Sequence, residues 1–263
     1  MDSRIFKSTD NDKVICGLCS HKCTVLPKQF GKCKTRYNES GVLKSLSYGR
    51  LIATALDPVE KKPLFHYKPG TLTYSVASPG CNLTCPFCQN HSISYLEREF
   101  SFKSIPFVSP KELTDRAIKC KAKSISFTYS EPILMMEYAQ DTAAIASTLG
   151  IDIIYVTNGQ ASNNAAEALS DFVTAANVDI KSFSKTNYQQ ILGGNLKATL
   201  NTIETLLKNN VWVEITTLLI PDFNDTNAEI ESIAKYIAQL DINIPWHISA
   251  FRPGNKWTHL PST

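Results

Sequence analysis

From residue 72 to the end of the chain, short apolar segments rich in β-branched residues alternate with longer segments of helical periodicity. The six strand-like segments cover residues 72–78, 124–128, 151–156, 178–181, 211–219 and 246–251. The helix-like segments cover residues 133–149, 164–175, 196–208 and 228–240. This alternation predicts an α/β fold with a parallel sheet. A closed eight-unit barrel takes about 250 residues, so this shorter stretch favours an open, partial (β/α)6 barrel.

Three cysteines, Cys81, Cys85 and Cys88, follow the first predicted strand in one short loop. Four-iron clusters are normally held by four thiolates, so three ligands leave one iron without a protein ligand. A zinc site would need a second pair of ligands, but the next cysteine, Cys120, stands alone. A disulfide is disfavoured because three closely spaced cysteines cannot all pair. The loop therefore predicts a [4Fe-4S] cluster with an open coordination position.

Polar side chains recur where the predicted strands end. They are Ser130, Glu131, Thr157, Asn158, Asp179, Lys181 and His247. In parallel α/β folds, ligands bind at the carboxyl ends of the strands. The sequence therefore predicts that these side chains face the cysteine loop across one site.

Each of these residues also has a simpler local explanation. The Ser-Glu-Pro run at 130–132 suits the start of a helix. The Asn-Gly pair at 158–159 is a common turn dipeptide. Asp179 and Lys181 share one face of a strand and can pair with each other. A histidine beside a tryptophan, as at His247, is often a packed core residue.

The first 70 residues differ from the rest of the chain. They contain four cysteines in a C-x2-C-x3-C-x9-C pattern: Cys16, Cys19, Cys23 and Cys33. A structural zinc or a second iron–sulfur cluster would each explain this spacing, and free thiols are the third alternative. We therefore expect a Cys-rich metal module with a linker at 1–70 and the partial-barrel domain at 71–263.

Composition favours a cytoplasmic enzyme. The chain has 263 residues, 43% of them hydrophobic, which is enough for a substantial core. Its 27 basic and 24 acidic side chains leave a net charge of +3, which gives no support for extensive nucleic-acid binding. The polar start lacks the apolar core of a signal peptide, and no stretch approaches the ~20 apolar residues of a membrane span. We expect neither a nucleic-acid nor a membrane partner.

The run C-N-L-T-C-P-F-C at 81–88 resembles the cluster loop of the radical S-adenosylmethionine (SAM) superfamily, which reads C-x3-C-x-aromatic-C. In that family the amino and carboxylate groups of SAM bind the open iron. The resemblance implies that the chain reductively cleaves SAM at a [4Fe-4S] cluster to generate a 5′-deoxyadenosyl radical. It also places Phe87 and Gln89 beside the cofactor. The alternative for Phe87 is a role in core packing only.

The strand-end residues resemble further motifs of this family. The run at 129–132 occupies the place of a Gly-Gly-Glu-Pro motif that binds the SAM amino group, but here Tyr and Ser replace both glycines. The run at 157–159 is similar to a turn near the SAM ribose or the substrate. The run at 179–181 resembles an Asp-x-Lys motif of glycyl-radical activating enzymes, and His247 matches a last-strand histidine that meets SAM. The resemblance implies cofactor-binding roles for Ser130, Glu131, Thr157, Asn158, Asp179, Lys181 and His247.

The segment from Asp57 to Tyr67 resembles the radical SAM component of the AmmeMemoRadiSam system, a group similar to pyruvate formate-lyase activating enzymes. Its Lys61 and Lys62 could be solvated or could face a partner. The resemblance implies an enzyme that takes electrons from an external low-potential donor and abstracts hydrogen from a protein or small-molecule substrate. The alternative is a non-catalytic iron–sulfur electron-transfer or metal-binding protein, against which the three-cysteine loop argues.

Overall fold

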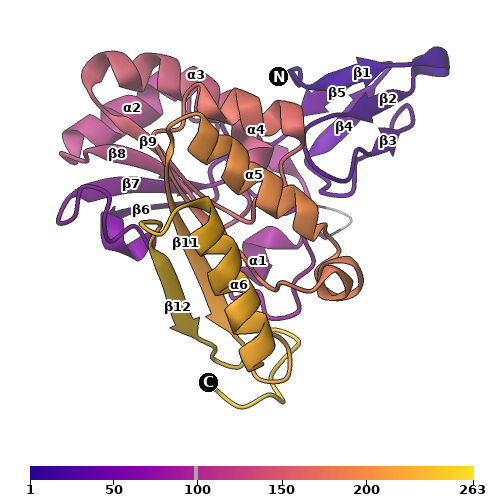
Figure 1. Cartoon of the computed structure of the whole chain (residues 1–263). Coiled ribbons are helices and arrows are strands. Elements are labelled where there is room, and N and C mark those ends of the chain that lie inside the picture. The colour runs from indigo at the N-terminus through magenta and orange to yellow at the C-terminus, as the bar shows by residue number, and fades with distance from the viewer. Residues whose placement is uncertain (98–99) are drawn as a thin grey trace.

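The computed structural model describes residues 1–97 and 100–263 and contains a seven-stranded central sheet (Figure 1). Its strands lie in the order β12-β11-β10-β9-β8-β7-β6. Strands β7 to β12 are parallel, and β6 runs antiparallel to β7 along one edge. The strands are β6 (Ala53–Pro58), β7 (Leu72–Ala77), β8 (Ser124–Phe127), β9 (Asp152–Thr157), β10 (Ala175–Asp179), β11 (Trp212–Leu219) and β12 (Trp246–Ala250).

The predicted α/β fold with six parallel strands is confirmed. Five of the six predicted strands agree with the structure within one residue at each end. Strand β10 begins three residues earlier than predicted, because Ala175 and Ala176 pair with Ile154 and Tyr155 of β9. Alanine is a weak strand former, so neighbouring strands and not local propensity determine this boundary.

Six α-helices connect or flank the strands in the described residues. They are α1 (His91–Ser94), α2 (Pro110–Lys119), α3 (Met136–Ala146), α4 (Asn163–Ser170), α5 (Leu196–Lys208) and α6 (Asn227–Leu240). The predicted helix at 133–149 is α3 with a 3-10 turn at each end, and α4 ends five residues before its predicted end because the chain turns into β10. Helix α2 was not predicted from the sequence.

Local sequence explains where several helices begin. Ser109 caps α2 by accepting a hydrogen bond from Glu112 N at 3.1 Å, and Pro110 suits the first turn. Thr226 caps α6 in the same way through Glu229 N at 3.3 Å. Apolar side chains on these amphipathic helices then pack toward the sheet.

The inner face of the sheet is partly covered by the segment at 59–67. Val59 and Leu64 of this segment pack against Ile154 and Ala175 from the sheet. Pro63 O accepts a hydrogen bond from Asn177 Nδ2 at 2.8 Å. This segment therefore fills part of the inside of the partial barrel.

The Cys-rich region forms two small sheets beside the main unit (Figure 1). One contains β1 (Phe6–Ser8), β2 (Val14–Cys16) and β3 (Thr24–Val25), and the other contains β4 (Arg36–Glu39) and β5 (Val42–Ser45). The buried side chains of Arg36 and Glu137 form an ion pair at 2.8 Å that joins this region to α3. Strand β6, which also precedes residue 70, belongs to the central sheet.

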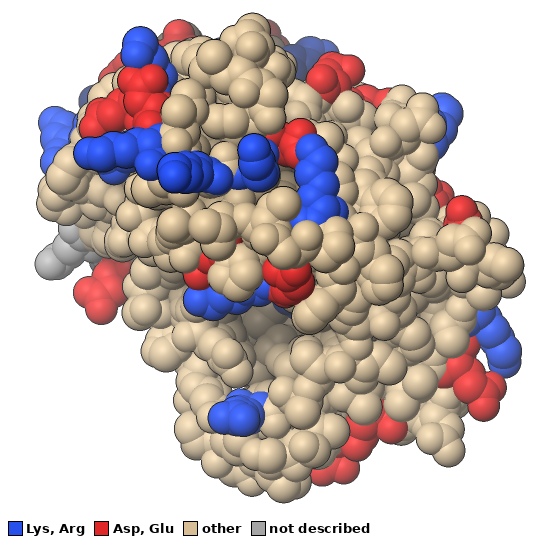
Figure 2. Space-filling model, turned by 90° about the vertical axis from the view of Figure 1, so that its left-hand side faces the viewer, with Lys and Arg blue, Asp and Glu red and all other residues tan. Residues whose placement is uncertain are grey.

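None of the helices in residues 1–97 and 100–263 combines the length and the apolar character that crossing a bilayer requires. The face shown in Figure 2 is hollowed near its centre, and both basic and acidic side chains gather along one side of the hollow.

Candidate active site

A cavity lies at the carboxyl ends of the parallel strands. It is lined by nine of the residues predicted from the sequence: Cys81, Cys85, Phe87, Cys88, Gln89, Glu131, Asn158, Asp179 and Lys181. The loops after β7, β8 and β9 and the end of β10 with its following loop supply them, as expected for a parallel α/β fold. Ser130, Thr157 and His247 do not line this cavity.

The cysteine loop is mostly buried, and the sulfur of Cys81 receives two hydrogen bonds. Leu83 N lies 3.4 Å from Cys81 Sγ, and Asn158 Nδ2 donates to the same sulfur at 3.7 Å. Burial raises the pKa of the Cys85 thiol to about 12, so this sulfur needs a bound metal to become a thiolate near neutral pH. Such N–H···S bonds stabilise cluster thiolates and tune cluster potentials.

The loop also fits a multi-iron group better than one ion. Three ligand atoms that could hold one ion should lie within about 4.8 Å of one another. Among the His, Cys, Asp and Glu side chains of the described residues, only His66, Glu214 and His247 meet this condition. At least two of the sulfurs of Cys81, Cys85 and Cys88 therefore lie more than 4.8 Å apart, farther than ligands around one ion. Asn82 adds a buried side-chain nitrogen that has no partner among the described residues, and a cluster sulfur would satisfy it.

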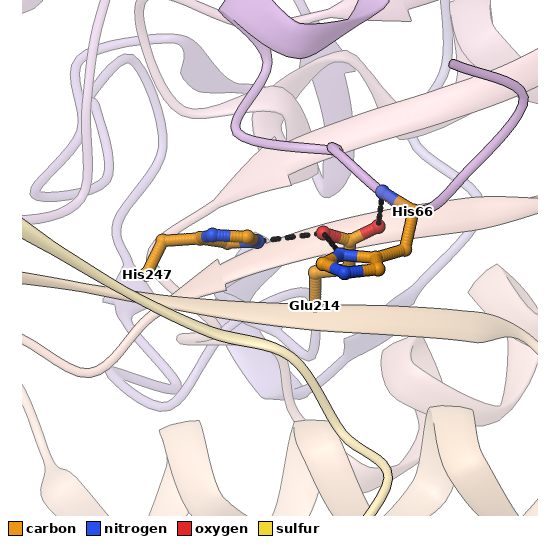
Figure 3. A group of neighbouring side chains, drawn as sticks. All are labelled: His66, Glu214 and His247. Atoms are coloured by element: carbon orange, nitrogen blue, oxygen red, sulfur yellow. Dashed lines mark hydrogen bonds and ion pairs between the residues drawn. The ribbon is translucent and has the colours of Figure 1, made fainter.

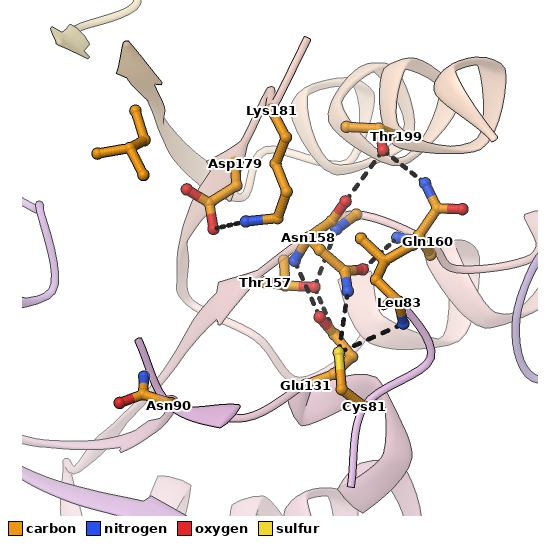
Figure 4. A network of polar contacts seen from close by, with 12 residues as sticks. Cys81, Leu83, Asn90, Glu131, Thr157, Asn158, Gln160, Asp179, Lys181 and Thr199 are labelled. Carbon is orange, nitrogen blue, oxygen red and sulfur yellow. Dashed lines mark hydrogen bonds and ion pairs between the residues drawn. The ribbon is translucent and has the colours of Figure 1, made fainter. Parts of the chain in front are cut away.

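Glu131 is the buried carboxylate of the site, with 2% of its surface exposed. It accepts hydrogen bonds from Thr157 Oγ1 at 2.6 Å and from Asn158 N at 2.9 Å (Figure 4). A third comes from Ile133 N at 3.0 Å. Burial raises the pKa of Glu131 to about 7, although these hydrogen bonds favour the ionised form. Thr157 thus acts on the site by orienting Glu131.

Tyr129 has a backbone φ of 66°, a left-handed conformation that glycine adopts at little cost. Its hydroxyl donates to Asp57 Oδ2 at 2.5 Å, and Lys62 Nζ lies 4.4 Å from its ring centroid. Asn90 Nδ2 donates to Tyr129 O at 2.9 Å. These contacts explain how tyrosine occupies a position where the resembling motif has glycine.

The two lysines near Asp57 have different environments. Lys62 Nζ is 2.8 Å from Asp57 Oδ2 and its side chain is 1% exposed, whereas Lys61 is 61% exposed and pairs with Asp57 Oδ1. Both lysines line the cavity. Lys61 therefore faces solvent, and Lys62 is a buried structural cation at the cavity wall.

Asp179 and Lys181 form an ion pair, with Lys181 Nζ 2.9 Å from Asp179 Oδ2 (Figure 4). Burial alone would lower the pKa of Lys181, but the Asp179 carboxylate holds that pKa above its usual range. The two residues thus pair with each other and also line the cavity.

The remaining predicted residues lie around this centre. Phe87 lines the cavity and packs on Phe223 and Trp257, with ring centroids 5.6 and 5.3 Å away, so it serves both the site and the core. Gln89 also lines the cavity. Ser130 donates its hydroxyl to Ser78 O at 2.5 Å and supports the loop from outside the cavity.

His247 belongs to a separate group with Glu214 and His66 (Figure 3). His247 Nε2 is 2.6 Å from Glu214 Oε2, and the same carboxylate accepts backbone N–H groups of Phe65 and His66 at 3.0 and 2.9 Å. Trp212 Nε1 adds a further hydrogen bond at 3.0 Å. Each carboxylate oxygen thus has two donors, so Glu214 anchors the loop at 63–67. Contact of His247 with SAM stays a prediction.

Sequence reasoning missed several residues that line the cavity, among them Lys61, Lys62, Asn90, Tyr129 and Leu218. Asn90 directly follows the cysteine loop, so its position in the chain could have identified it. The two lysines come from a segment before the first parallel strand, and only the folded chain brings them to the cavity.

Comparisons with known proteins agree with this geometry. The sequence model of the radical SAM superfamily matches residues 75–237. An uncharacterized protein of Methanocaldococcus jannaschii, MJ0808, is 35% identical over 265 residues, covering 100% of this chain and 78% of that protein. A second protein of that organism, MJ1227, provisionally named a glycyl-radical enzyme activating enzyme, is 26% identical over 68% of this chain and 72% of its own length.

Two solved structures share the fold. SuiB of Streptococcus suis has a TM-score of 0.54 at 13% identity, covering 71% of this chain and 41% of SuiB. The structure of anSMEcpe with bound AdoMet has a TM-score of 0.50 at 18% identity, covering 66% of this chain and 51% of that protein. The chain thus spans about half or less of these two proteins, and the likeness is one of fold.

Proposed function

The chain belongs to the radical SAM superfamily, and from this membership we propose that it is an enzyme of the activating-enzyme type that abstracts hydrogen from a protein or small-molecule substrate. When bound, the [4Fe-4S] cluster and SAM of this superfamily supply reductive cleavage to methionine and a 5′-deoxyadenosyl radical. One observation carries the proposal: the three loop cysteines share a cavity with Glu131, Asp179 and Lys181.

The residues around the cavity have distinct tasks in this proposal. Cys81, Cys85 and Cys88 hold the cluster and leave one iron open to SAM. Glu131, whose orientation is fixed by its hydrogen bonds, accepts a hydrogen bond from the SAM amino group. Phe87 packs with neighbouring aromatic rings and keeps water away from the reacting centre.

The activating-enzyme type is supported by the similarity to MJ1227 over 68% of this chain. Activation of a partner protein requires an extended peptide segment to reach the cavity. A protein with this fold, SuiB, has been solved with its precursor peptide SuiA. We place the enzyme in the cytoplasm, since all eight cysteines are free thiols in the structure.

Anaerobic reconstitution with iron and sulfide, followed by reduction with dithionite and addition of SAM, tests the proposal. We expect 5′-deoxyadenosine and methionine, detected by liquid chromatography and mass spectrometry. The Cys85→Ala variant should form neither product, whereas Cys120→Ala, which changes a cysteine outside both cysteine sets, should behave as wild type. Product formation by Cys85→Ala would overturn the assignment.

Two further measurements address the finer parts of the proposal. A non-catalytic electron-transfer protein would show a cluster whose paramagnetic resonance spectrum does not change when SAM is added. A peptide deuterated at glycine Cα tests the substrate class, because hydrogen abstraction would transfer deuterium into 5′-deoxyadenosine.

A further inference from the structure

The four N-terminal cysteines converge on one small cavity although they come from different segments. Cys16 ends β2, Cys19 and Cys23 lie in the turn that follows, and Cys33 precedes β4. All four line the cavity, together with apolar neighbours. All four are free thiols, so no disulfide explains their approach.

The distances between the sulfurs distinguish a zinc site from a site for a multi-iron cluster. Around a tetrahedral zinc with Zn–S bonds of about 2.3 Å, the four sulfurs would lie about 3.8 Å from one another. No three of these sulfurs lie within 4.8 Å of one another, since the only such trio in the described residues contains no cysteine. The cavity that they line together with six other residues is small, with a volume of about 10 Å³. The four sulfurs therefore do not lie at the distances of a single tetrahedral zinc site.

The cysteines of the active-site loop provide an internal comparison. The sulfurs of Cys81, Cys85 and Cys88, which hold the superfamily's four-iron cluster, likewise do not form a trio within 4.8 Å. The two cysteine sets therefore share the wide spacing that a multi-iron group needs.

The surroundings of the N-terminal cysteines suit a cluster. Leu18 and Leu134 on the cavity wall are each 1% exposed, which excludes water. Lys32 N donates to Cys23 Sγ at 3.5 Å, and Thr35 Oγ1 lies 3.2 Å from Cys33 Sγ. Hydrogen bonds of this kind to ligand sulfur stabilise iron–sulfur clusters and tune their potentials.

We propose that Cys16, Cys19, Cys23 and Cys33 bind a second [4Fe-4S] cluster in place of zinc. With four cysteine ligands this cluster has no open iron, so its chemistry is one-electron transfer and not SAM binding. An electron from an external low-potential carrier reduces it without breaking a bond.

The second cluster would lie beside the first. Cys33 and Cys81 line one further cavity between the module and the active-site loop. Gly80, which precedes Cys81, packs so closely that an added Cβ would lie 2.5 Å from Thr35 Cγ2. The two metal sites are therefore adjacent, as an electron relay into the active site requires.

The test measures metal content without relying on activity. The combined Cys81→Ala, Cys85→Ala and Cys88→Ala variant removes the active-site cluster and leaves the N-terminal cysteines intact. After anaerobic reconstitution we expect this variant to retain about four iron and four sulfide ions per chain, against about eight of each in the wild type. It should also show a cluster resonance spectrum on reduction, with no change on addition of SAM. One zinc per chain without labile sulfide, or no bound metal, would overturn the proposal.

A second variant removes one of the proposed N-terminal ligands and keeps the three active-site cysteines. Cys33→Ser should lower iron and sulfide to about half of the wild-type content, whereas the control Cys120→Ser should leave them unchanged. An undiminished iron content in soluble Cys33→Ser would contradict the ligand assignment. Iron and sulfide content tests the second cluster, whereas formation of 5′-deoxyadenosine tests the proposed enzyme activity. The two proposals can therefore fail independently of each other.

Discussion

The side-chain nitrogen of Asn158 lies 3.7 Å from the Cys81 sulfur, and the backbone nitrogen of the same residue donates to Glu131 Oε2 at 2.9 Å. Asn158 Nδ2 also donates to Asn82 Oδ1 at 2.9 Å. One residue thus connects a cluster ligand to the carboxylate proposed to bind SAM. The side chain of Asn158 thus acts on the cluster ligand, whereas its backbone acts on the carboxylate.

Asn158→Ala should slow SAM cleavage by about 10–100-fold, the usual effect of losing a group that hydrogen-bonds to a metal ligand. The variant removes the N–H···S bond to Cys81 but keeps the backbone bond to Glu131. The rate of 5′-deoxyadenosine formation and the cluster reduction potential measure the effect. Asn201→Ala, on the outer surface of α5, is the control and should leave both unchanged. A wild-type potential in Asn158→Ala would show that the sulfur contact is unimportant.

SAM affinity should depend on the ionisation of Glu131, whose pKa is raised to about 7. Below this pH the carboxyl is neutral and attracts the SAM amino group less, so affinity should fall as pH decreases, approaching tenfold per pH unit. Equilibrium dialysis with SAM at about one pH unit on each side of the pKa measures the change. Glu131→Gln should bind SAM weakly at both pH values, and an equally steep pH dependence in this variant would exclude Glu131 as the titrating group.

The same shift predicts a pH effect on the folding of the apoprotein. The pKa of an unperturbed glutamate is 4.5, and burial raises the pKa of Glu131 in the folded protein to about 7. Between these values the folded state holds its proton more tightly than the unfolded state, so the free energy of unfolding should decrease as pH rises from 4.5 to about 7. Urea titrations of wild type and Glu131→Gln should diverge in this window, and parallel pH curves would contradict the shift.

The Arg36–Glu137 pair should contribute strongly to the attachment of the Cys-rich module. Both side chains are 1% exposed, and two N–O contacts of 2.8 Å join them. Arg36→Met leaves a buried charge unpaired and should lower the free energy of unfolding by about 3–5 kcal/mol. The double variant Arg36→Met, Glu137→Leu should recover part of this loss. Lys111→Met removes only an exposed ion pair and should change stability by less than about 1 kcal/mol. Chemical denaturation measures each value.

Glu214→Gln should loosen the loop at 63–67, because an amide cannot accept all the hydrogen bonds of the carboxylate. Burial alone would raise the pKa of Glu214, but the donors around it hold that pKa below the usual value. The carboxylate should therefore contribute stability above about pH 4.5 that is lost as pH falls through its lowered pKa. We expect a loss of about 1–3 kcal/mol near neutral pH, measured by denaturation, that diminishes in acid. The exposed Glu167→Gln serves as control, and a neutral effect of Glu214→Gln would contradict the anchoring role.

The sequence predicted the sheet and most of the cavity because both depend on local patterns. Strands and strand-end residues can be identified from short runs, and parallel strands bring their ends together. The position of Glu131 followed from the run at 129–132, and the structure places it in the cavity with the cysteine loop.

What the sequence did not predict depends on contacts between distant segments. The positive φ of Tyr129 is held by Asp57 and Lys62, which lie far away in the chain. Glu214 resembles any polar residue of a strand until the loop at 63–67 folds onto it. Strand β6 could not be assigned to the sheet from its own residues. It runs antiparallel to β7, whereas the alternating pattern of the sequence predicted only parallel strands.

Two of the three lysines at the cavity, Lys62 and Lys181, pair with Asp57 and Asp179, and the exposed Lys61 shares Asp57 with Lys62. A sulfonium compound carries a permanent positive charge, which unpaired ammonium groups would repel at close range. Pairing with aspartate neutralises Lys181 and one of the two lysine charges beside Asp57, which lowers this barrier to entry. The cavity can therefore admit a cationic ligand without a surplus of negative charge.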